Sequence, residues 1–231
     1  MAEDEQSDTE PRSFLTCATE VARLLGVEDV AVAPNDRHAR LLAHAVRKPL
    51  LERASLPEEL FAPLMAASVY DPDPSFCRWF VEPAVYAFGR RRVTAALVDY
   101  LRTGTDAERA GAVRAWYCAH VPLHADRSPA YGSAGVRDPA LDEVQDIKDA
   151  WLEASMRVFA EATDPRMRHR VLLGLPTSRA AYPPRLHDLL ESTLASAQAH
   201  PDQHIRRWAA AMDHEAASAR QSDRAAVNTS R

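Results

Sequence analysis

The chain has 231 residues, 46% of them apolar, and no run approaches the roughly 20 apolar residues that a membrane-spanning helix needs. Its formal net charge is −5, and the first ten residues account for all of it through Glu3, Asp4, Glu5, Asp8 and Glu10. The remainder is neutral overall and does not favour nucleic acid, because binding to phosphates usually needs a broad basic stripe.

The acidic start of the chain lacks the apolar segment of a signal peptide, so we expect none, and we expect residues 1–12 to be a disordered, solvated tail. The three cysteines, Cys17, Cys77 and Cys118, are odd in number and show no metal-type spacing. They predict free thiols in a reducing compartment, and hence a cytoplasmic protein.

The first 88 residues contain four predicted helices. Residues 13–25 form the first, with Ser13 as its cap, and residues 36–46 form the second, which Pro49 is expected to end. Ser55 opens the third, with Pro57 near its first turn, where the missing N–H costs nothing. The fourth covers 76–88, and Pro83 inside it is expected to kink or split it.

Residues 90–119 read as two antiparallel helices joined by a short loop. Val93, Ala96, Leu97, Tyr100 and Leu101 recur at helical spacing and predict the first of them. Gly104 is expected to end this helix in the left-handed conformation, and Asp106 to cap the next one. A loop this short makes the pair an αα-hairpin.

Residues 121–139 interrupt this pattern with three prolines and two glycines, and predict a long loop. Loops of this length without secondary structure tend to be functional or disordered. Further helices are predicted at 140–162, which is the longest, and at 164–175, 185–199 and 202–217. The polar residues 218–231 are expected to be a disordered tail.

The predicted helices suggest a repeat, because every second one begins with Asp and carries Arg about one turn later. These pairs are Asp36 and Arg40, Asp73 and Arg78, Asp106 and Arg109, Asp164 and Arg168, and Asp202 and Arg206. The Asp spacings are 37, 33, 58 and 38 residues, and the 58 becomes 39 without the 19-residue loop. Two helices per unit at this period predict an all-α, right-handed α-solenoid of about five antiparallel hairpins over 13–217.

Three segments resemble HEAT repeats of a bacterial type. DQHIRRWAAAM at 202–212 and DPRMRHRVLLGL at 164–175 look like second helices of such repeats, with Asp followed by an apolar–Arg pair. VEPAVYAFGRRRVTAALVDYL at 81–101 looks like the side of the first helix. The sequence departs from the pattern at Asp106 and in 121–139. The resemblance implies a HEAT- or armadillo-like solenoid that binds partners, and it implies no chemistry by itself.

The repeated Asp and Arg residues favour a structural role, in which Asp caps a helix and Arg reaches the Asp of the next unit. The alternative is a partner-binding surface made of Arg40, Arg78, Arg114, Arg168 and Arg206, with Trp116 beside the 121–139 loop. The run Arg90–Arg92 is expected to be a solvated turn. His120 and His124 could suggest a metal, but Pro122 disrupts the helical spacing between them, so no metal site is predicted.

No catalytic constellation and no cofactor are expected. The leading hypothesis is an interaction or scaffold protein that holds a protein or peptide on its concave face and the 121–139 loop. The alternative is a DNA-binding protein or DNA-alkylation-repair glycosylase on the same scaffold, using Trp116, Asp106 and Arg114. The neutral body counts against that alternative.

Overall fold

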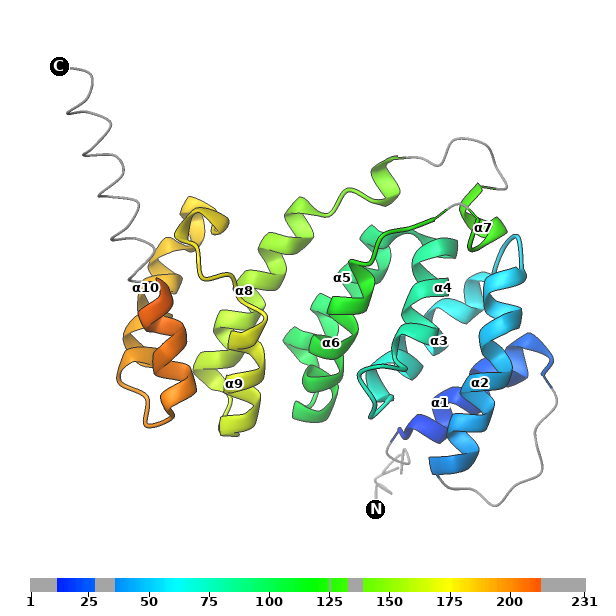
Figure 1. Cartoon of the computed structure of the whole chain (residues 1–231), viewed down its shortest axis with the longest axis horizontal. Coiled ribbons are helices and arrows are strands. Elements are labelled where there is room, and N and C mark those ends of the chain that lie inside the picture. The colour runs from blue at the N-terminus through cyan, green and yellow to red at the C-terminus, as the bar shows by residue number, and fades with distance from the viewer. Residues whose placement is uncertain (1–11, 28–35, 125, 133–138, 213–231) are drawn as a thin grey trace, which may run out of the picture.

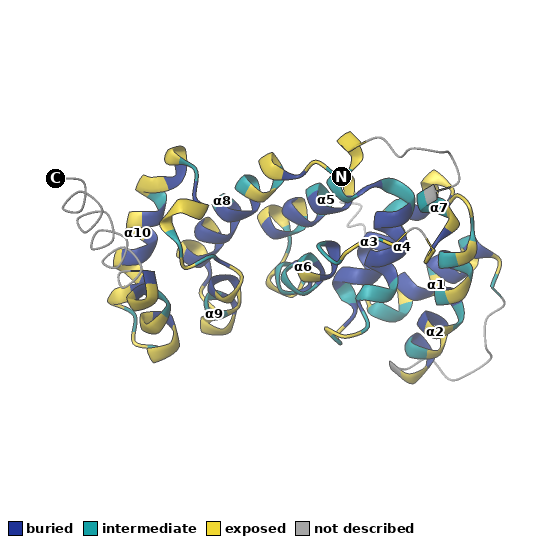
Figure 2. Cartoon of the chain, turned by 45° about the horizontal axis from the view of Figure 1, so that its top comes forward, coloured by how far each residue is buried: buried dark blue, intermediate teal, exposed yellow. Residues whose placement is uncertain are grey.

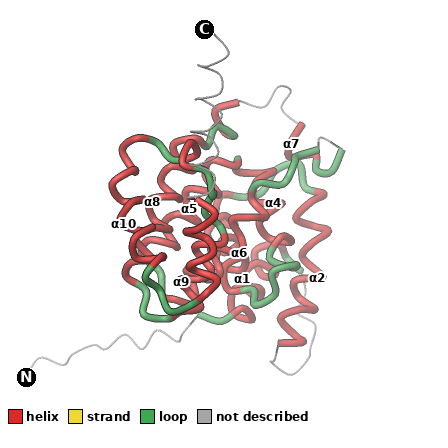
Figure 3. Tube along the Cα trace, turned by 60° about the vertical axis from the view of Figure 1, so that its left-hand side comes forward, coloured by secondary structure: helices red, strands yellow, loops and turns green. Residues whose placement is uncertain are grey.

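The computed structural model describes residues 12–27, 36–124, 126–132 and 139–212. Within these ranges every regular element is a helix, and no strand occurs (Figure 3). The all-α prediction is therefore confirmed. The tails expected at 1–12 and 218–231 lie outside the described residues, apart from Arg12. No described helix has the length and apolar character needed to cross a membrane.

The described part of the chain contains eleven α-helices and four short 3-10 helices. The first six α-helices are α1 (Phe14–Leu25), α2 (Asp36–Glu52), α3 (Phe61–Tyr70), α4 (Arg78–Phe88), α5 (Arg90–Thr103) and α6 (Asp106–Ala119). They are followed by α7 (Pro129–Gly132), α8 (Gln145–Glu161), α9 (Pro165–Leu173), α10 (His187–Gln198) and a last helix at 203–212. The 3-10 turns are η1 (Glu58–Leu60), η2 (Pro139–Leu141), η3 (Arg179–Ala181) and η4 (Pro184–Leu186).

Apart from α7, which lies beside α2 and α4, the helices follow one another in space in the order of the chain, with α1 and α2 at one end and α10 at the other (Figure 1). Helices that are consecutive in the chain contact each other in the pairs α1–α2, α3–α4, α5–α6 and α8–α9. The first helices of these pairs also meet their counterparts, since α1 contacts α3, α5 contacts α8 and α8 contacts α10. The second helices do so through α4–α6 and α6–α9.

One continuous apolar core runs through this row of helices. Leu64, Phe80 and Leu97 are fully buried, and each such side chain contributes roughly 1.5–3 kcal/mol to folding. The burial is densest in α3 and α4, as Figure 2 shows. α3 also lies very close to α6, because Gly111 has no Cβ and one placed there would overlap the Val69 carbonyl oxygen. This close approach joins the second and third helix pairs.

Pro49 and Pro83 both lie inside continuous helices, so the predicted helix end at Pro49 and the predicted split at Pro83 are wrong. Pro49 does not end its helix, because α2 continues to Glu52 with Pro49 inside it. Proline removes only one hydrogen bond, and Leu50 in the following turn is fully buried, which favours continuing the helix. Pro83 likewise does not divide α4, which runs unbroken from Arg78 to Phe88.

Two predictions about the α5–α6 hairpin need correction. Gly104 does end α5, but in an extended conformation with φ −74° rather than a left-handed one. Its small size matters instead, because a Cβ would lie 2.9 Å from the Cβ of Glu108. The cap of α6 is Thr105 rather than Asp106: its hydroxyl accepts from the Glu108 N–H, while the Glu108 carboxylate accepts from the Thr105 N–H.

The segment 121–139 contains helical structure, contrary to the predicted irregular loop. α7 lies within it, η2 begins at its end, and α8 begins only at Gln145 rather than at residue 140. From the end of α6 the chain runs back toward earlier helices, where α7 contacts both α2 and α4 (Figure 1). Residues 125 and 133–138 lie outside the described part.

Candidate functional site

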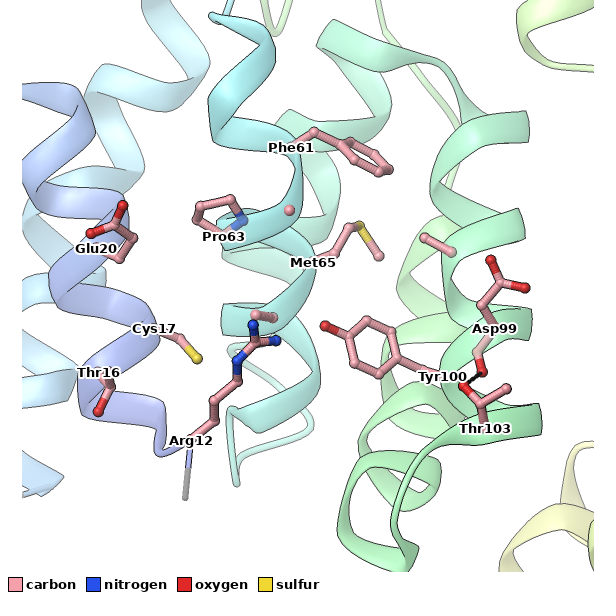
Figure 4. A pocket seen from close by; sticks show the side chains of 13 residues that line it. Arg12, Thr16, Cys17, Glu20, Phe61, Pro63, Met65, Asp99, Tyr100 and Thr103 are labelled. Atoms are coloured by element: carbon pink, nitrogen blue, oxygen red, sulfur yellow. Dashed lines mark hydrogen bonds between the residues drawn. The ribbon is translucent and has the colours of Figure 1, made fainter. Parts of the chain in front are cut away.

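The clearest concave feature is a groove whose walls are α1 and α5 and whose floor is α3, with a volume of about 550 Å³ (Figure 4). α1 contributes Thr16, Cys17 and Glu20, and Arg12 lies just before this helix. The floor is made of Phe61, Ala62, Pro63, Met65 and Ala66. α5 contributes Ala96, Asp99, Tyr100 and Thr103.

Helical spacing explains why these side chains face a common space. Thr16 and Glu20 are one turn apart on α1, Ala62 and Ala66 one turn apart on α3, and Ala96, Tyr100 and Thr103 follow the same stripe on α5. α3 has the sequence FAPLMAASVY, with no charged residue on any face. A helix of this composition is buried between neighbours, and only its edge between α1 and α5 remains accessible.

The electrostatics of the groove differ between its floor and its rims. Burial raises the pKa of Cys17 to about 11, against the opposing effect of Arg12. Burial also raises the pKa of Tyr100, again opposed by Arg12. At the rims, a hydrogen bond from Arg23 lowers the pKa of Glu20, and Asp99 is exposed on the opposite side. Cys17 and Tyr100 on the walls are therefore neutral at pH 7, Arg12 adds one positive charge, and a carboxylate stands on each rim.

This arrangement is suited to binding rather than to bond breaking. A thiol nucleophile must be ionised, and the Cys17 thiol is protonated at neutral pH. The Thr103 hydroxyl donates to the Asp99 carbonyl at 2.9 Å, within its own helix. The groove offers an apolar floor with small residues and polar edges, which is the composition of a recognition surface.

Arg40, a predicted partner-binding residue, forms a bidentate ion pair with the fully buried Asp71, at 2.7 and 3.0 Å. Its guanidinium also lies over the ring of Phe76, 4.4 Å from the centroid, and over that of Phe14 at 5.0 Å. The side chain of Arg40 is 28% exposed. It joins α2 to the turn after α3.

Arg78 shares a buried carboxylate with a residue of the 121–139 loop. Glu82, whose side chain is 4% exposed, accepts from Arg78 in its own helix and from Arg127 in that loop. Burial acts to raise the pKa of Glu82, but the hydrogen bonds from Arg127 and Arg78 outweigh it and lower the pKa. Glu82 therefore stays ionised and holds the loop against α4.

Arg114 and Trp116 lie on α6 and also contact other elements. Arg114 donates to the carbonyl oxygens of Asp71 at 2.9 Å and Val69 at 3.3 Å. The Trp116 ring stacks on Trp151 of α8, with centroids 4.0 Å apart and an interplanar angle of 6°. Asp106 is the first residue of α6 and Trp116 the eleventh, roughly 15 Å apart along the helix axis. The structure therefore does not bring the predicted glycosylase residues together.

Arg168 and Arg206 repeat one local contact. Arg168 Nε donates to the Ala162 carbonyl at 2.7 Å, and Arg206 Nη1 donates to the His200 carbonyl at 2.7 Å, in each case six residues back. The side chains of Asp164 and Asp202 each accept from the N–H two residues on, at 2.9 and 2.7 Å. The capping role predicted for these two residues is therefore present.

The predicted ladder from Arg to the Asp of the next unit is wrong. Of the five repeated arginines, only Arg40 reaches a later aspartate within the described ranges, and that residue is Asp71 rather than Asp73. Asp73 instead accepts from the Ser75 N–H at 2.8 Å. Arg109 Nη1 lies 3.7 Å from Oδ1 of Asp106, which belongs to the same helix. The side chain of Asp36 lies outside the described part of the structure.

The prediction that Arg90–Arg92 is a solvated turn was wrong. These residues begin α5, and each of them binds a residue outside that helix. Arg90 donates to the carbonyl oxygens of Ala119 and Val121. Arg91 pairs with Asp146, just inside α8, and Arg92 pairs with Glu58 while lying over the Phe61 ring at 3.9 Å. Arg92 thus covers the aromatic end of the groove.

The described part of the 121–139 loop is tied to α4 at several points. The His124 N–H donates to the Tyr86 hydroxyl at 3.0 Å, and the Tyr86 and Tyr131 rings meet edge to face. Ser128 is buried. Between this loop and α2 lies a second cleft of about 580 Å³, lined by His44, Arg47, Lys48, Leu51, Glu52, His124, Asp126 and Arg127. Its charges are mixed, and two of its cations, Lys48 and Arg127, already have acidic partners.

Among the described residues, no group of His, Cys, Asp and Glu side chains has the arrangement of a metal site. The three cysteines are free and buried, as predicted for reduced thiols. The Sγ atoms of Cys77 and Cys118 are 3.6 Å apart. His120 Nδ1 donates to the Trp116 carbonyl oxygen at 2.8 Å, and burial lowers the pKa of His120.

Comparisons with protein-family models, with curated proteins and with solved structures gave no match for this chain. The groove residues were not among the sequence-based candidates, which were chosen for charge. The available signal was α3 itself, because a ten-residue helix without a polar face must lie between neighbours. The edge of α3 that stays open is set by the distance between α1 and α5. No local sequence pattern predicts that distance.

Proposed function

We propose that this chain is a non-catalytic interaction protein, built as a HEAT-like right-handed solenoid of five helical hairpins, that binds a protein or peptide. The row of contacts α1–α3, α5–α8 and α8–α10 supports the solenoid, as do α4–α6 and α6–α9. The shared Arg168 and Arg206 contacts support the repeat, because two segments of similar sequence adopt the same local geometry. Stacked hairpins present extended surfaces on rigid helices.

The observation that carries the binding proposal is the groove between α1, α3 and α5. We assign it to an amphipathic helix of a partner protein. The floor residues of α3, from Phe61 to Ala66, span roughly 9 Å, which matches about two turns of a docked helix. Ala62, Ala66 and Ala96 allow a backbone to approach closely, and Met65 adapts its shape to apolar side chains.

The rims indicate the charge of this partner. Glu20 and Asp99 stand on opposite walls. A basic residue beside the apolar stripe of the docked helix would meet Asp99 directly, and one on the other side would share Glu20 with Arg23. The described part of the 121–139 loop is bound to α4 and lines the separate cleft beside α2. The proposed main contact is therefore the groove, and the loop serves as a secondary contact.

The test begins with a photo-crosslinking amino acid at Ala62, which is exposed in the groove, and at Ala180, which is exposed in η3. The partner captured at Ala62 is identified by mass spectrometry, and its purified binding segment is titrated by calorimetry against full-length variants. Ala62→Arg fills the groove and should weaken binding about tenfold or more, while Ala180→Arg should leave it unchanged. Equal affinity for the wild type and Ala62→Arg would refute the groove as the binding site.

A further inference from the structure

A second surface, on α9 and the last helix, carries positive charge that the fold itself does not use. Neither α9 nor residues 203–212 contain a single carboxylate, yet together they carry Arg166, Arg168, Arg170, Arg206 and Arg207. Arg168 and Arg206 are bound to turn carbonyls. The other three are exposed, and within the described ranges none of them has an ion-pair or hydrogen-bond partner for its side chain.

The exposed residues of α9 form one stripe. Met167, Val171 and Leu172 face the core, while the exposed Arg166, Arg170 and Leu173 and the half-buried His169 recur at the spacing i, i+3, i+4 and i+7 on the opposite side. Leu173 is 74% exposed, one of four large apolar residues of the described chain that face solvent. Leu173 therefore lies one helical turn after Arg170 in the same stripe.

Contacts between helices place this stripe beside two others. The His169 and His204 rings lie 5.5 Å apart, so the stripe continues onto the last helix, where Arg207 is one turn from His204. On the other side α9 contacts α6, and the positive charge of Arg170 acts on Arg114 there. We call the set Arg166, His169, Arg170, Leu173, His204 and Arg207 the basic face.

From these contacts we infer that the basic face binds an acidic peptide segment that carries an apolar residue. Asp202 lies near His169 and His204, but the three arginines have no acidic partner in the described ranges. Unpaired like charges favour an anionic ligand, because its binding relieves their repulsion. Leu173, at the end of α9, then supplies an exposed apolar contact beside them. This site is on different helices from the groove, and it does not depend on the function proposed for the groove.

The same charges fit a nucleic acid less well. Nucleic-acid binding draws on many phosphate contacts, about 6–10 for a typical protein, and three unpaired arginines are too few. An exposed leucine after these arginines also has no counterpart on a phosphate backbone. A peptide that alternates acidic and apolar residues satisfies both features.

The experiment titrates the full chain with a fluorescein-labelled peptide that repeats Asp-Leu-Glu-Glu four times, followed by anisotropy. A second peptide has serine in place of leucine, and a third probe is single-stranded DNA of equal charge. The triple variant Arg166→Glu, Arg170→Glu and Arg207→Glu should weaken the leucine peptide more than about tenfold. The matched control reverses Arg37, Arg102 and Lys148, which are exposed on other helices, and should change the affinity less than about twofold.

Leu173→Ala separates the peptide from the nucleic-acid outcome. It should weaken binding of the leucine peptide several-fold and leave the serine peptide and the DNA unaffected. Circular dichroism of each variant confirms that the helices are retained. The inference is overturned if the control reversal has the same effect as the triple variant, if the DNA binds more tightly than both peptides, or if no peptide binds at low salt.

Discussion

The N-terminal region, α1–α7, and the C-terminal region, from α8 to the last helix, use arginine in different ways. In the N-terminal region arginines bind acceptors far away in sequence: Arg40 pairs with Asp71, Arg127 with Glu82, and Arg114 with the carbonyls after α3. In the C-terminal region Arg185 also pairs with a distant residue, Asp149, but Arg168 and Arg206 bind only the preceding turn, and Arg166, Arg170 and Arg207 are exposed with no partner in the described ranges. The comparison indicates that similar arginine patterns stabilise one region and form a surface on the other.

The largest expected effect contrasts a glycine in each region. In Gly111→Ala the new methyl group overlaps the Val69 carbonyl oxygen, so α3 and α6 must separate, at a cost of about 3 kcal/mol in free energy of unfolding. In Gly174→Ala the methyl group would be 3.5 Å from its nearest neighbour, an ordinary contact. That variant should be within about 0.5 kcal/mol of the wild type in urea denaturation. Similar losses for both variants would contradict the tighter packing of the N-terminal region.

The junction of the two regions is tested by Trp116→Ala. This change removes the stack on Trp151 that joins α6 to α8, and it should cost about 2–3 kcal/mol, below the usual loss for a fully buried tryptophan because Trp116 is half-buried. Trp116→Phe should restore part of the loss. If Trp116→Ala leaves thermal denaturation unchanged, the stack does not hold the regions together, and Trp116 is free to serve as a contact residue.

Glu82→Gln tests the cross-element pairs through pH. The pKa of Glu82 is lowered in the folded protein, so its ionised form contributes stability above the unfolded pKa of about 4.5, and this contribution is lost as the pH falls through the folded value. At pH 7 the variant should be less stable by about 1–2 kcal/mol, a moderate value because Arg78 and Arg127 are partly exposed and screened. The difference should shrink below pH 4.5. A pH-independent difference would show that shape, not charge, is responsible.

The smallest expected effect concerns the groove. Ala62→Arg introduces an exposed side chain on the floor between α1 and α5 and should change the free energy of unfolding by less than about 0.5 kcal/mol, even though it blocks the proposed partner site. Ala180→Arg provides the matched control in the other region. A large loss of stability for Ala62→Arg alone would mean that the groove is closed by packing and is not available to a partner.

The sequence was sufficient for the helices themselves, because their apolar residues recur at 3.6-residue spacing and strong signals such as Ser13 mark their starts. It was insufficient where two signals competed. Pro49 lies inside α2 because the burial of Leu50 outweighs one lost hydrogen bond, and Thr105 rather than Asp106 caps α6 because Glu108 completes a reciprocal bond.

The ion pairs and the groove were harder to predict because they form between elements that are far apart in the sequence. Arg40 and Asp71 are 31 residues apart, and Arg91 and Asp146 are 55 apart, so no local pattern reveals these pairs. The repeated Asp and Arg residues were visible in the sequence, but which arginines remain exposed depends on the packing of α6, α9 and the last helix. The groove also depends on α1 and α5 standing apart on either side of α3.

Denaturation of Arg40→Met and Arg170→Met, measured side by side in urea, tests the difference between the two regions most directly. The two substitutions are chemically identical. Arg40→Met leaves the buried Asp71 carboxylate without its cation and should cost about 3 kcal/mol, while Arg170→Met should cost less than about 0.5 kcal/mol. Equal losses, or a larger loss for Arg170→Met, would contradict the assignment of one arginine to the fold and the other to a binding surface.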